Sequence, residues 1–477
     1  MRLKIEPAAN VVPPQANMSL LSNLLIGQSG LRAANAGISA TSHNVANSGS
    51  PGFTRRRLVN GVANPLRHGR VWLGQGATTQ GMERVTDHLM TTRRIQQAGV
   101  QSQKGFAWRT MRSIDRVMDA GEGSTSKDAL DSFFDSLTRA TADPSDQSLR
   151  RGIVRSGQFL VSLVARDGRA FQNAIDDHES DAANSLPVIN EKLAKVALLN
   201  RAIKSSVSQG LTAGDFSDQR DLLLRDLGEL AGINVHLESN GVATVFMGGH
   251  VAVTGEESRT LSSDVSSGDL RILMSTSRDE FVNITSGMGG EIGGHLEVRE
   301  LSTDYLGRLN TFAEDMATAM NTQHRAGYDY LGAAGGDLFS FDASNAAQTL
   351  TMSANVLSNP EHIAFGGTTP TLSGDIDNLR LLIGMENNLI VDGARTANQW
   401  LTDIVTEVGT DIANLEQLAI THEAVLRDMD EMDQNLHGVD LDEEATQLVM
   451  YQAAYQASAR VISTSQDMLG ILMELVR

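Results

Sequence analysis

Histidines and carboxylates are the residues of this sequence that could carry metal or acid–base chemistry, and their spacing argues against both. His422 and His437 are too far apart to share one helix face as a ligand pair, and no two histidines are four residues apart. Asp428, Asp430 and Asp433 are spaced like the start of a calcium-binding loop, but the glycine and the glutamate that such a loop requires are missing. We therefore expect these aspartates on the solvated face of a helix.

Motifs for nucleophilic catalysis and phosphate binding are also incomplete. The chain has no cysteine and no Gly-x-Ser-x-Gly elbow. The glycine-rich segment from Gly287 to Gly294 could cradle a phosphate before a helix, but no Lys-Ser/Thr pair follows it, which favours a tight turn. The paired carboxylates Glu443 and Glu444 are common in any acidic chain. We expect no catalytic residues, no metal, no cofactor and no enzymatic activity.

Near both ends of the chain, apolar residues recur every seven residues. This period makes a narrow apolar stripe that needs a partner helix. The C-terminal stripe consists of Leu441, Leu448, Tyr455, Ile462, Leu469 and Val476, with Tyr451 and Leu472 on the same face. The N-terminal stripe consists of Leu24, Leu31, Ile38 and Val45. We expect the terminal helices to meet each other or those of neighbouring copies, although periodicity alone equally allows each to pack on a local core.

The composition indicates an acidic protein of several domains. Its 477 residues are enough for two to four domains, and the formal charge is −19 at pH 7. Such a charge disfavours general nucleic-acid binding. Aromatic residues make up 4% of the chain, which suits close helix contacts better than an aromatic-lined pocket. No run of 18 apolar residues occurs, so we expect no membrane insertion.

The first residues lack the apolar core of a cleavable secretory signal, because Glu6 and three prolines interrupt them. We expect residues 1–17 to be a disordered extension, with Ser19 as the N-cap of the first helix. Three glycines in that helix should make it marginal in isolation. Export of this chain would require a route that needs no cleaved signal.

The pattern of the whole chain predicts a mainly α protein with a small β domain. Pro187 is expected to separate two long helices. Asn240-Gly241 between alternating apolar runs predicts a hairpin, and Asp440 with Glu443 predicts a capping box for the last helix. At the ends of the chain we expect the extension at 1–17, the N-terminal part of an inner coiled-coil domain with an extended loop at 18–83, and the C-terminal coiled-coil helix at 437–477. Between them we expect a helical bundle in two parts, 84–230 and 295–436, with the β domain at 231–294. Short strands are expected within the second part of the bundle, at 337–372.

Residues 54–112 form a basic stretch within the acidic chain, in which Arg55, Arg56 and Arg57 stand together. Such a stretch could bind nucleic acid. However, Phe53 and Trp72 are the only aromatic residues between positions 53 and 105, so no stacking platform for bases is evident. We favour the interpretation that the stretch contacts acidic parts of neighbouring copies.

Motifs at both ends of the chain resemble one protein family. Ala46-Asn47-x-x-Ser50-Pro51-Gly52-Phe53 is similar to the Ala-Asn-x-x-Thr-Pro-Gly-(Tyr/Phe) signature of the flagellar rod, hook and hook-associated proteins, with serine in place of threonine. Residues 438–444 and 451–460 resemble the ending of the flagellar hook-associated protein 1 family. Segments of the middle that are similar to the same family are 218–221, 289–294, 321–328 and 335–339.

The resemblance implies a structural axial protein of the bacterial flagellum at the junction between hook and filament. The terminal helices would pair into an inner coiled-coil tube, the bundle would form the next shell, and a β-rich domain would face outward. The implied partners are further copies of the chain, hook protein, the second hook–filament junction protein and an export chaperone at the C-terminal helix. The protein would be extracellular, exported through the flagellar type III apparatus without a cleaved signal.

The expected subunit contacts are the two apolar stripes together with Asn47, Pro51, Gly52 and Phe53. The middle of the chain is short for the family, so any additional outer domain should be small or absent. Two other functions stay open at this point. One is another rod or hook subunit, and the other is a flagellar enzyme that cuts the cell wall and would need a catalytic carboxylate in a cleft.

Overall fold

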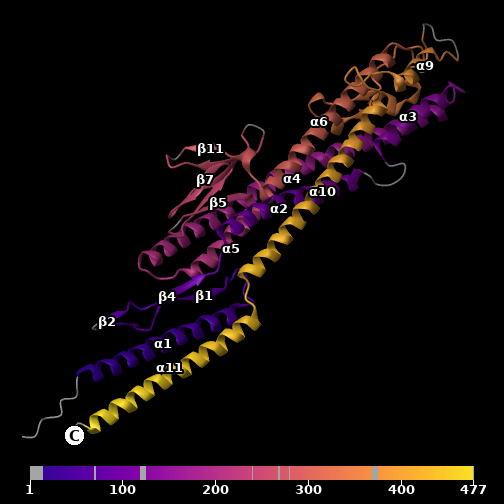
Figure 1. Ribbon diagram of the computed structural model, residues 1–477. Helices are drawn as coiled ribbons and strands as arrows, with labels where there is room; N and C mark the ends of the chain where they lie inside the picture. The colour runs from indigo at the N-terminus through magenta and orange to yellow at the C-terminus, as the bar shows by residue number, and fades with distance from the viewer. Residues whose placement is uncertain are drawn as a thin grey trace, which may run out of the picture.

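The computed structural model describes residues 14–68, 71–118, 125–238, 240–266, 269–278, 280–367 and 374–475. The protein is mainly helical and elongated, with the two terminal helices side by side at one end and the helical body extending away from them (Figure 1). The α-helices are α1 Pro14–Asn47, α2 His88–Met118, α3 Ser126–Ala140, α4 Gln147–Ser208, α5 Gly214–Ala231, α6 Gly290–Arg325, α7 Ala346–Thr349, α8 Ala354–Ser358, α9 Asp377–Gly384, α10 Ala397–His437 and α11 Leu441–Leu475.

The strands form small antiparallel sheets. Their order is β1-β4, β2-β3, β5-β6-β7-β8, β11-β10-β9 and β12-β13. The strands are β1 Arg56–Val62, β2 Leu66–His68, β3 Val71–Leu73, β4 Ala77–Arg84, β5 Ile233–Leu237, β6 Ala243–Met247, β7 His250–Thr254, β8 Glu257–Ser258, β9 Leu261–Asp264, β10 Arg271–Ser275, β11 Phe281–Asn283, β12 Phe339–Ser340 and β13 Thr351–Met352.

Two hydrophobic cores hold the body together, and among the described residues neither core includes a residue of α1 or α11. The first core joins α3, α6, α9, α10 and the first half of α4, and its fully buried side chains include Phe133, Phe171 and Phe312. The second core lies where the strands from β5 to β10 pack on α5 and the second half of α4. Helices α2, α4 and α6 contribute residues to both cores, so they connect them.

Helix α4 runs unbroken over 62 residues, so the expectation that Pro187 separates two helices is wrong. A proline inside a helix removes one backbone donor and crowds the preceding turn. Leu186 and Ile189, on either side of the proline, are buried in the second core. Their packing against the sheets holds the helix together across the proline.

The hairpin predicted at Asn240-Gly241 is present, because β5 pairs antiparallel with β6 on either side of it. Gly241 has a φ of +83°, a backbone conformation that glycine adopts without strain. Asn200 of α4 fastens this sheet to the helix. Its side-chain amide donates to the carbonyl oxygen of Ala243 at 2.8 Å, and its carbonyl accepts from the N–H of Ala243 at 3.0 Å.

The glycine-rich segment is a tight turn packed against protein, as its sequence predicts. Gly290 has a φ of +61° and begins α6. A Cβ atom on Gly290 would lie 2.5 Å from the backbone nitrogen of Ala231, and one on Gly232 would lie 2.5 Å from the Cα of Gly289. The end of α5 therefore occupies the space that a bound phosphate would need.

The first helix begins earlier than the sequence predicts. It starts at Pro14, so residues 14–17 of the expected disordered extension are helical, and Ser19 lies inside the helix and is not its N-cap. Proline is favoured in the first turn of a helix because its missing N–H has no partner there and its φ suits a helix. Residues 1–13 of the expected extension lie outside the described residues.

Candidate subunit interface at the chain termini

Helices α1 and α11 lie side by side and run antiparallel (Figure 1). The direction follows from their contacts, because Gly37 faces Tyr451, whereas the earlier Gly27 faces the later Ile462. A Cβ atom on Gly37 would lie 2.5 Å from the Tyr451 ring, and one on Gly27 would lie 2.9 Å from the Ile462 side chain. The glycines therefore allow the two helices to approach more closely than larger residues would permit.

Most buried residues of the α1 seam are small, and this row is offset from the predicted stripe. Buried positions recur every seven residues at Leu20, Gly27, Ala34 and Thr41. The predicted stripe lies beside this row, with Leu24, Leu31 and Ile38 half-buried and Val45 exposed. The seven-residue period was correct, but on α1 glycines face α11 where the two helices approach closely, and the large stripe residues lie beside them.

Part of the predicted stripe of α11 lies in this seam, where Tyr451 faces Gly37 and Ile462 faces Gly27. Its half-buried members are Leu448, Tyr451, Ile462, Leu469 and Leu472. Leu441 and Tyr455 are 53% and 39% exposed, so they lie outside the buried seam. Val476 lies outside the described residues.

The outward sides of both helices carry many exposed apolar residues. Strands β1 and β4 lie along one side of α1 (Figure 1). A dense set of exposed apolar side chains is typical of a surface that contacts other proteins. The large apolar residues exposed on the two helices are Leu21, Leu25, Val45, Leu441, Val449, Met450, Tyr455, Val461, Met468, Ile471 and Met473.

The turn that follows α1 is shaped by its own polar side chains. The side-chain amide of Asn47 donates to the carbonyl oxygen of His43 at 3.0 Å, and its carbonyl accepts from the Ser50 hydroxyl at 3.2 Å. The backbone N–H of Ser50 donates to the carbonyl oxygen of Asn47 at 2.9 Å. Pro51 at the tip of the turn is exposed.

The second half of this turn lies against the body of the same chain. Gly52 has a φ of +75°, and a Cβ atom there would contact Leu222 of α5 at 3.5 Å. Phe53 is half-buried, with its ring centroid 5.4 Å from that of His43. The signature residues therefore form the joint between α1 and the body.

Arg55 links this joint to the start of α11. Its guanidinium donates two hydrogen bonds to the Glu443 carboxylate, at 2.7 and 3.0 Å, and one to Glu444 at 2.8 Å. The hydrogen bonds from Arg55 lower the pKa of Glu443, and the same bonds raise the pKa of Arg55. Asp440 caps the helix by accepting from the N–H of Asp442 at 2.9 Å. The predicted capping box is incomplete because the Glu443 side chain binds Arg55.

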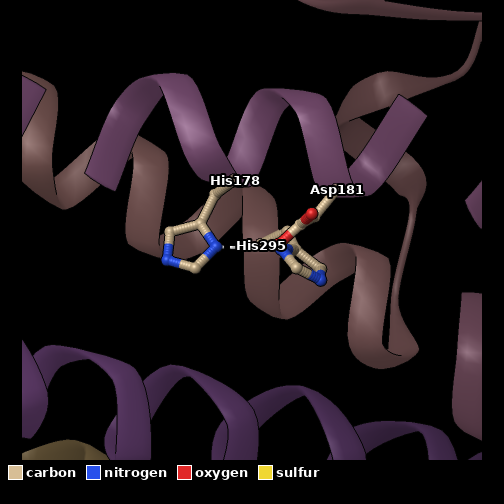
Figure 2. Close-up of side chains that lie close together, drawn as sticks. All are labelled: His178, Asp181 and His295. Carbon is tan, nitrogen blue, oxygen red and sulfur yellow. Dashed lines mark hydrogen bonds between the residues drawn. The ribbon is translucent and has the colours of Figure 1, made fainter. Parts of the chain in front are cut away.

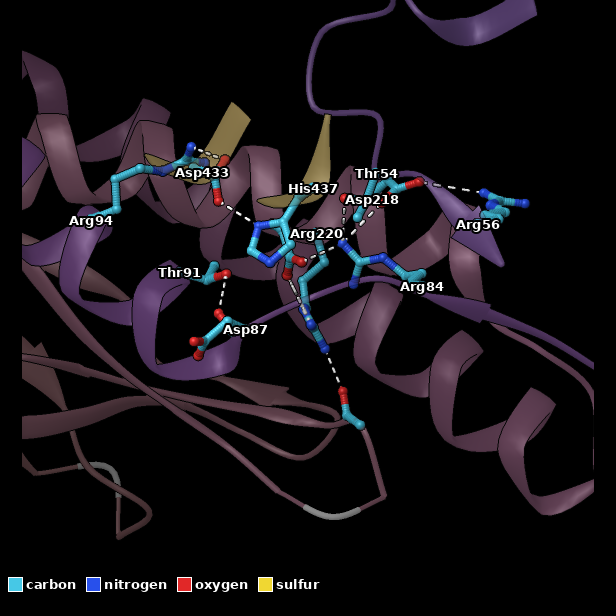
Figure 3. Close-up of polar contacts among 12 residues, drawn as sticks. Thr54, Arg56, Arg84, Asp87, Thr91, Arg94, Asp218, Arg220, Asp433 and His437 are labelled. Carbon is cyan, nitrogen blue, oxygen red and sulfur yellow. Dashed lines mark hydrogen bonds and ion pairs between the residues drawn. The ribbon is translucent and has the colours of Figure 1, made fainter. Parts of the chain in front are cut away.

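A cluster of arginines and aspartates joins β1, β4 and α5 next to the joint (Figure 3). Arg84 lies 2.9 Å from Asp218 and 2.8 Å from Asp221. Arg56 pairs with Asp215 and lies 3.3 Å from Asp218. Burial raises the pKa of Asp218, although the two arginines act in the opposite direction.

Arg94 of α2 makes a matching link to the end of α10 (Figure 3). It pairs with Asp433 and lies 3.4 Å from Asp430, and Asp433 also lies 2.8 Å from Nδ1 of His437. Asp428 is exposed, as a solvated helix face requires. The same expectation is wrong for Asp433, because Arg94 and His437 cover its side chain.

These contacts give four arginines of the basic stretch partners within the same chain. Arg55, Arg56, Arg84 and Arg94 each pair with carboxylates of the same chain, so acidic groups of neighbouring copies are not needed to neutralise them. The network holds the α1–α11 pair against the body through charge-assisted hydrogen bonds.

One group that sequence reasoning missed could hold a metal ion. His178 and Asp181 of α4 and His295 of α6 place three ligand atoms within 4.8 Å of one another, the one such group found within the described part of the chain. His178 and Asp181 are three residues apart and so share a helix face, which was the available sequence signal. His295 is 117 residues away from His178, and no pattern connects it to them.

Two family models match the sequence. One describes the helical domain of the flagellar hook-associated protein FlgK and matches residues 111–339. The other describes the C-terminal region of the flagellar basal body rod FlgEFG proteins and matches residues 435–475. The first covers α3 to α6 and the strands from β5 to β11, and the second covers α11. Together they span more than half of the chain.

Relatives called flagellar hook-associated protein 1 match over nearly their full lengths. The protein of Escherichia coli (strain K12) is 26% identical over 553 residues, which cover 96% of this chain and 100% of the relative. The protein of Salmonella typhimurium is 25% identical, covering 94% of this chain and 98% of the relative. The protein of Bacillus subtilis (strain 168) is 24% identical, covering 92% and 95%.

A solved structure shows the same fold. The flagellar hook junction protein FlgK from Burkholderia pseudomallei superposes with a TM-score of 0.64 at 15% identity, covering 72% of this chain and 99% of that chain. Its fold agrees with a mainly α protein that carries a small β region. The helical-domain model and these nearly full-length relatives agree, and the chain belongs to the flagellar hook-associated protein 1 family.

Proposed function

We propose that this chain is a structural axial subunit of the bacterial flagellum that forms the junction between hook and filament. The observation that carries the proposal is the exposed apolar surface on the outward sides of α1 and α11. Neither hydrophobic core includes a described residue of α1 or α11, so the helix pair gains burial by contacting other copies. The names of the relatives, flagellar hook-associated protein 1, supply the place at which such a subunit would assemble.

In this function, copies of the chain associate through their terminal helix pairs into an inner tube. The helical body forms the next shell and the sheets from β5 to β11 face outward. Hook protein lies on one side of the assembly and the second hook–filament junction protein on the other. We also propose export to the cell exterior without a cleaved signal, with an export chaperone bound to the C-terminal helix. A helix pair that is marginal in isolation suits such handling.

No helix in the described part of the chain is both long enough and apolar enough to cross a membrane.

Deleting the gene tests the place of action. Electron microscopy of the deletion strain should show hooks without filaments, and an assay of the culture medium should detect unincorporated flagellin. Normal filaments in the deletion strain would refute a role at the junction.

Two double variants test the surface itself. Leu448→Asp with Ile462→Asp should abolish assembly and leave the body folded, because Ile462 faces Gly27 of α1 and Leu448 is half-buried on the same helix. Val449→Asp with Ile471→Asp charges the outward side and should abolish assembly with the helix pair still formed. The matched control is Val188→Asp with Leu198→Asp, at exposed positions of α4. Equal incorporation of the Val449/Ile471 variant and the control into flagella would refute the interface.

A second candidate is another axial subunit of the rod or hook. It is favoured by the match of residues 435–475 to the rod-protein family model. Labelling the assembled protein in isolated flagella would separate the two functions. Label confined to the distal end of the hook supports the junction, and label along the rod or hook supports the alternative.

A further inference from the structure

Two histidines from different helices face each other at the level where one hydrophobic core ends and the other begins (Figure 2). His178 of α4 and His295 of α6 have their Nδ1 atoms 3.0 Å apart. Along α4, Ile175 belongs to the first core and the second core starts at Leu186. The histidine pair therefore lies where apolar packing between α4 and α6 is interrupted.

Phe106 of α2 closes one side of the histidine pair. Its ring centroid lies 4.3 Å from that of His295 and 5.7 Å from that of His178. His295 is only 4% exposed. Each imidazole offers a ring nitrogen that can bind a metal ion, and the two Nδ1 atoms already face each other.

Asp181 adds an oxygen ligand on the open side of the pair. It lies one turn after His178 on the same face of α4, and its carboxylate is beside His295 (Figure 2). Arg299, one turn after His295, is bound by Glu179 and by Asp269 at 2.7 Å. That cation is therefore held by other carboxylates.

We propose that His178, His295 and Asp181 bind one divalent transition-metal ion, with Zn²⁺ as the expected occupant. Imidazole nitrogens with a carboxylate oxygen suit zinc and its neighbours in the first transition row, whereas calcium and magnesium prefer oxygen ligands alone. Two nitrogens on a tetrahedral zinc ion lie about 3.3 Å apart, close to the spacing of the histidine pair. Rotation of the exposed Asp181 side chain brings the third ligand to the ion, and water takes the fourth position.

The ion would join α4 to α6 where neither core holds them together. Its effect is expected to be structural, since it links two helices that each run through both cores. Binding to the folded state alone stabilises the protein by an amount that grows with the logarithm of the free ligand concentration, so the thermal midpoint of unfolding rises as zinc is added.

The test uses the untagged full-length protein after treatment with a chelator. Calorimetric titration with ZnCl₂ should show one saturable site per chain, and Co²⁺ should give the visible absorption of a tetrahedral nitrogen–oxygen site. His178→Gln and Asp181→Asn should each weaken Zn²⁺ binding at least tenfold and remove the zinc-dependent rise in the thermal midpoint. The matched control His250→Gln, at an exposed histidine of β7, should bind as the wild type does.

Asp181→Asn keeps the test decisive if a histidine variant fails to fold, because Asp181 is exposed and its replacement preserves side-chain size. Circular dichroism confirms the fold of each variant. Wild-type protein without saturable Zn²⁺ binding overturns the proposal, as does equal affinity of the wild type and Asp181→Asn. Either result would leave His178 and His295 as a hydrogen-bonded pair.

Discussion

The helix pair α1–α11 and the body are built from similar long helices, but they place their apolar residues differently. In the body, Phe171 of α4 and Tyr305 of α6 are at most 1% exposed, with ring centroids 5.7 Å apart. In the pair, the buried seam holds glycine and alanine, and large apolar residues such as Val449 and Ile471 lie outside it.

The difference shows that the two regions complete their cores by different routes. The body buries its large side chains within one chain, and such burial contributes most of the stability of a folded domain. The pair makes close backbone contacts with little burial of large side chains. Its apolar burial would be completed by neighbouring copies, so we expect the isolated chain to have a stable body and a weakly held pair.

The largest expected effect is the loss of a core ring from the body. Phe171→Ala should lower the free energy of unfolding by about 3–5 kcal/mol, because it removes contacts with Tyr305 and leaves a cavity. The matched change in the pair, Leu469→Ala, should cost the isolated chain about 1 kcal/mol or less, since Leu469 is only half-buried. Urea unfolding followed by the fluorescence of Trp108 in α2 and Trp400 in α10 measures the loss in the body, and hydrogen exchange in α11 measures the loss in the pair. Equal decreases in stability for Phe171→Ala and Leu469→Ala would contradict the difference between the body and the pair.

A smaller effect is expected at the link between the two regions. Arg55→Leu leaves the Glu444 carboxylate unpaired, and that side chain is 1% exposed. The variant should weaken the docking of α11 by about 2–3 kcal/mol. Hydrogen exchange should then become faster in α11 and stay unchanged in α4. Glu443→Gln is the control, because Glu443 is 51% exposed and should cost under about 1 kcal/mol. Faster exchange throughout α4 would show that the regions are not independent.

The smallest effect is a difference in acid sensitivity, at most about 1.4 kcal/mol per pH unit for each proton. In the body, His324 accepts from the N–H of Ala364 at 2.9 Å, so its other nitrogen donates to Gly336 at 2.7 Å and the ring is neutral. Burial lowers its pKa below the usual 6.5. Below pH 6.5 the unfolded chain therefore binds a proton that the folded chain does not, and stability falls as the pH decreases.

The link at Glu443 does not change in this range. Its pKa is lowered from 4.5 by the hydrogen bonds from Arg55, so its contribution is fully present above pH 4.5 and is lost only at lower pH. Between these two values the body should weaken while the link persists. Urea unfolding across this range should show a shallower pH dependence for His324→Gln than for the wild type. The same slope in both proteins would contradict the assignment to His324.

Local features of the fold could be predicted from the sequence, because they depend on residues near one another in the chain. The Asn240-Gly241 hairpin and the turn before α6 are examples, since a glycine with positive φ specifies each. Where the sequence interpretation failed, contacts between residues far apart in the chain outweighed the preference of a single residue. Pro187 does not break α4, because buried neighbours hold the helix across it.

The sequence by itself determined the class of the fold, the seven-residue period of both terminal helices and the motifs of the family. These properties depend on residue order alone. The tertiary structure decided which row of each terminal helix forms the seam, because the close approach at Gly37 depends on where Tyr451 lies. It also decided that Arg55 binds Glu443, 388 residues away, and that His178 meets His295. Contacts at such separations arise from the packing of whole helices, which no local pattern specifies.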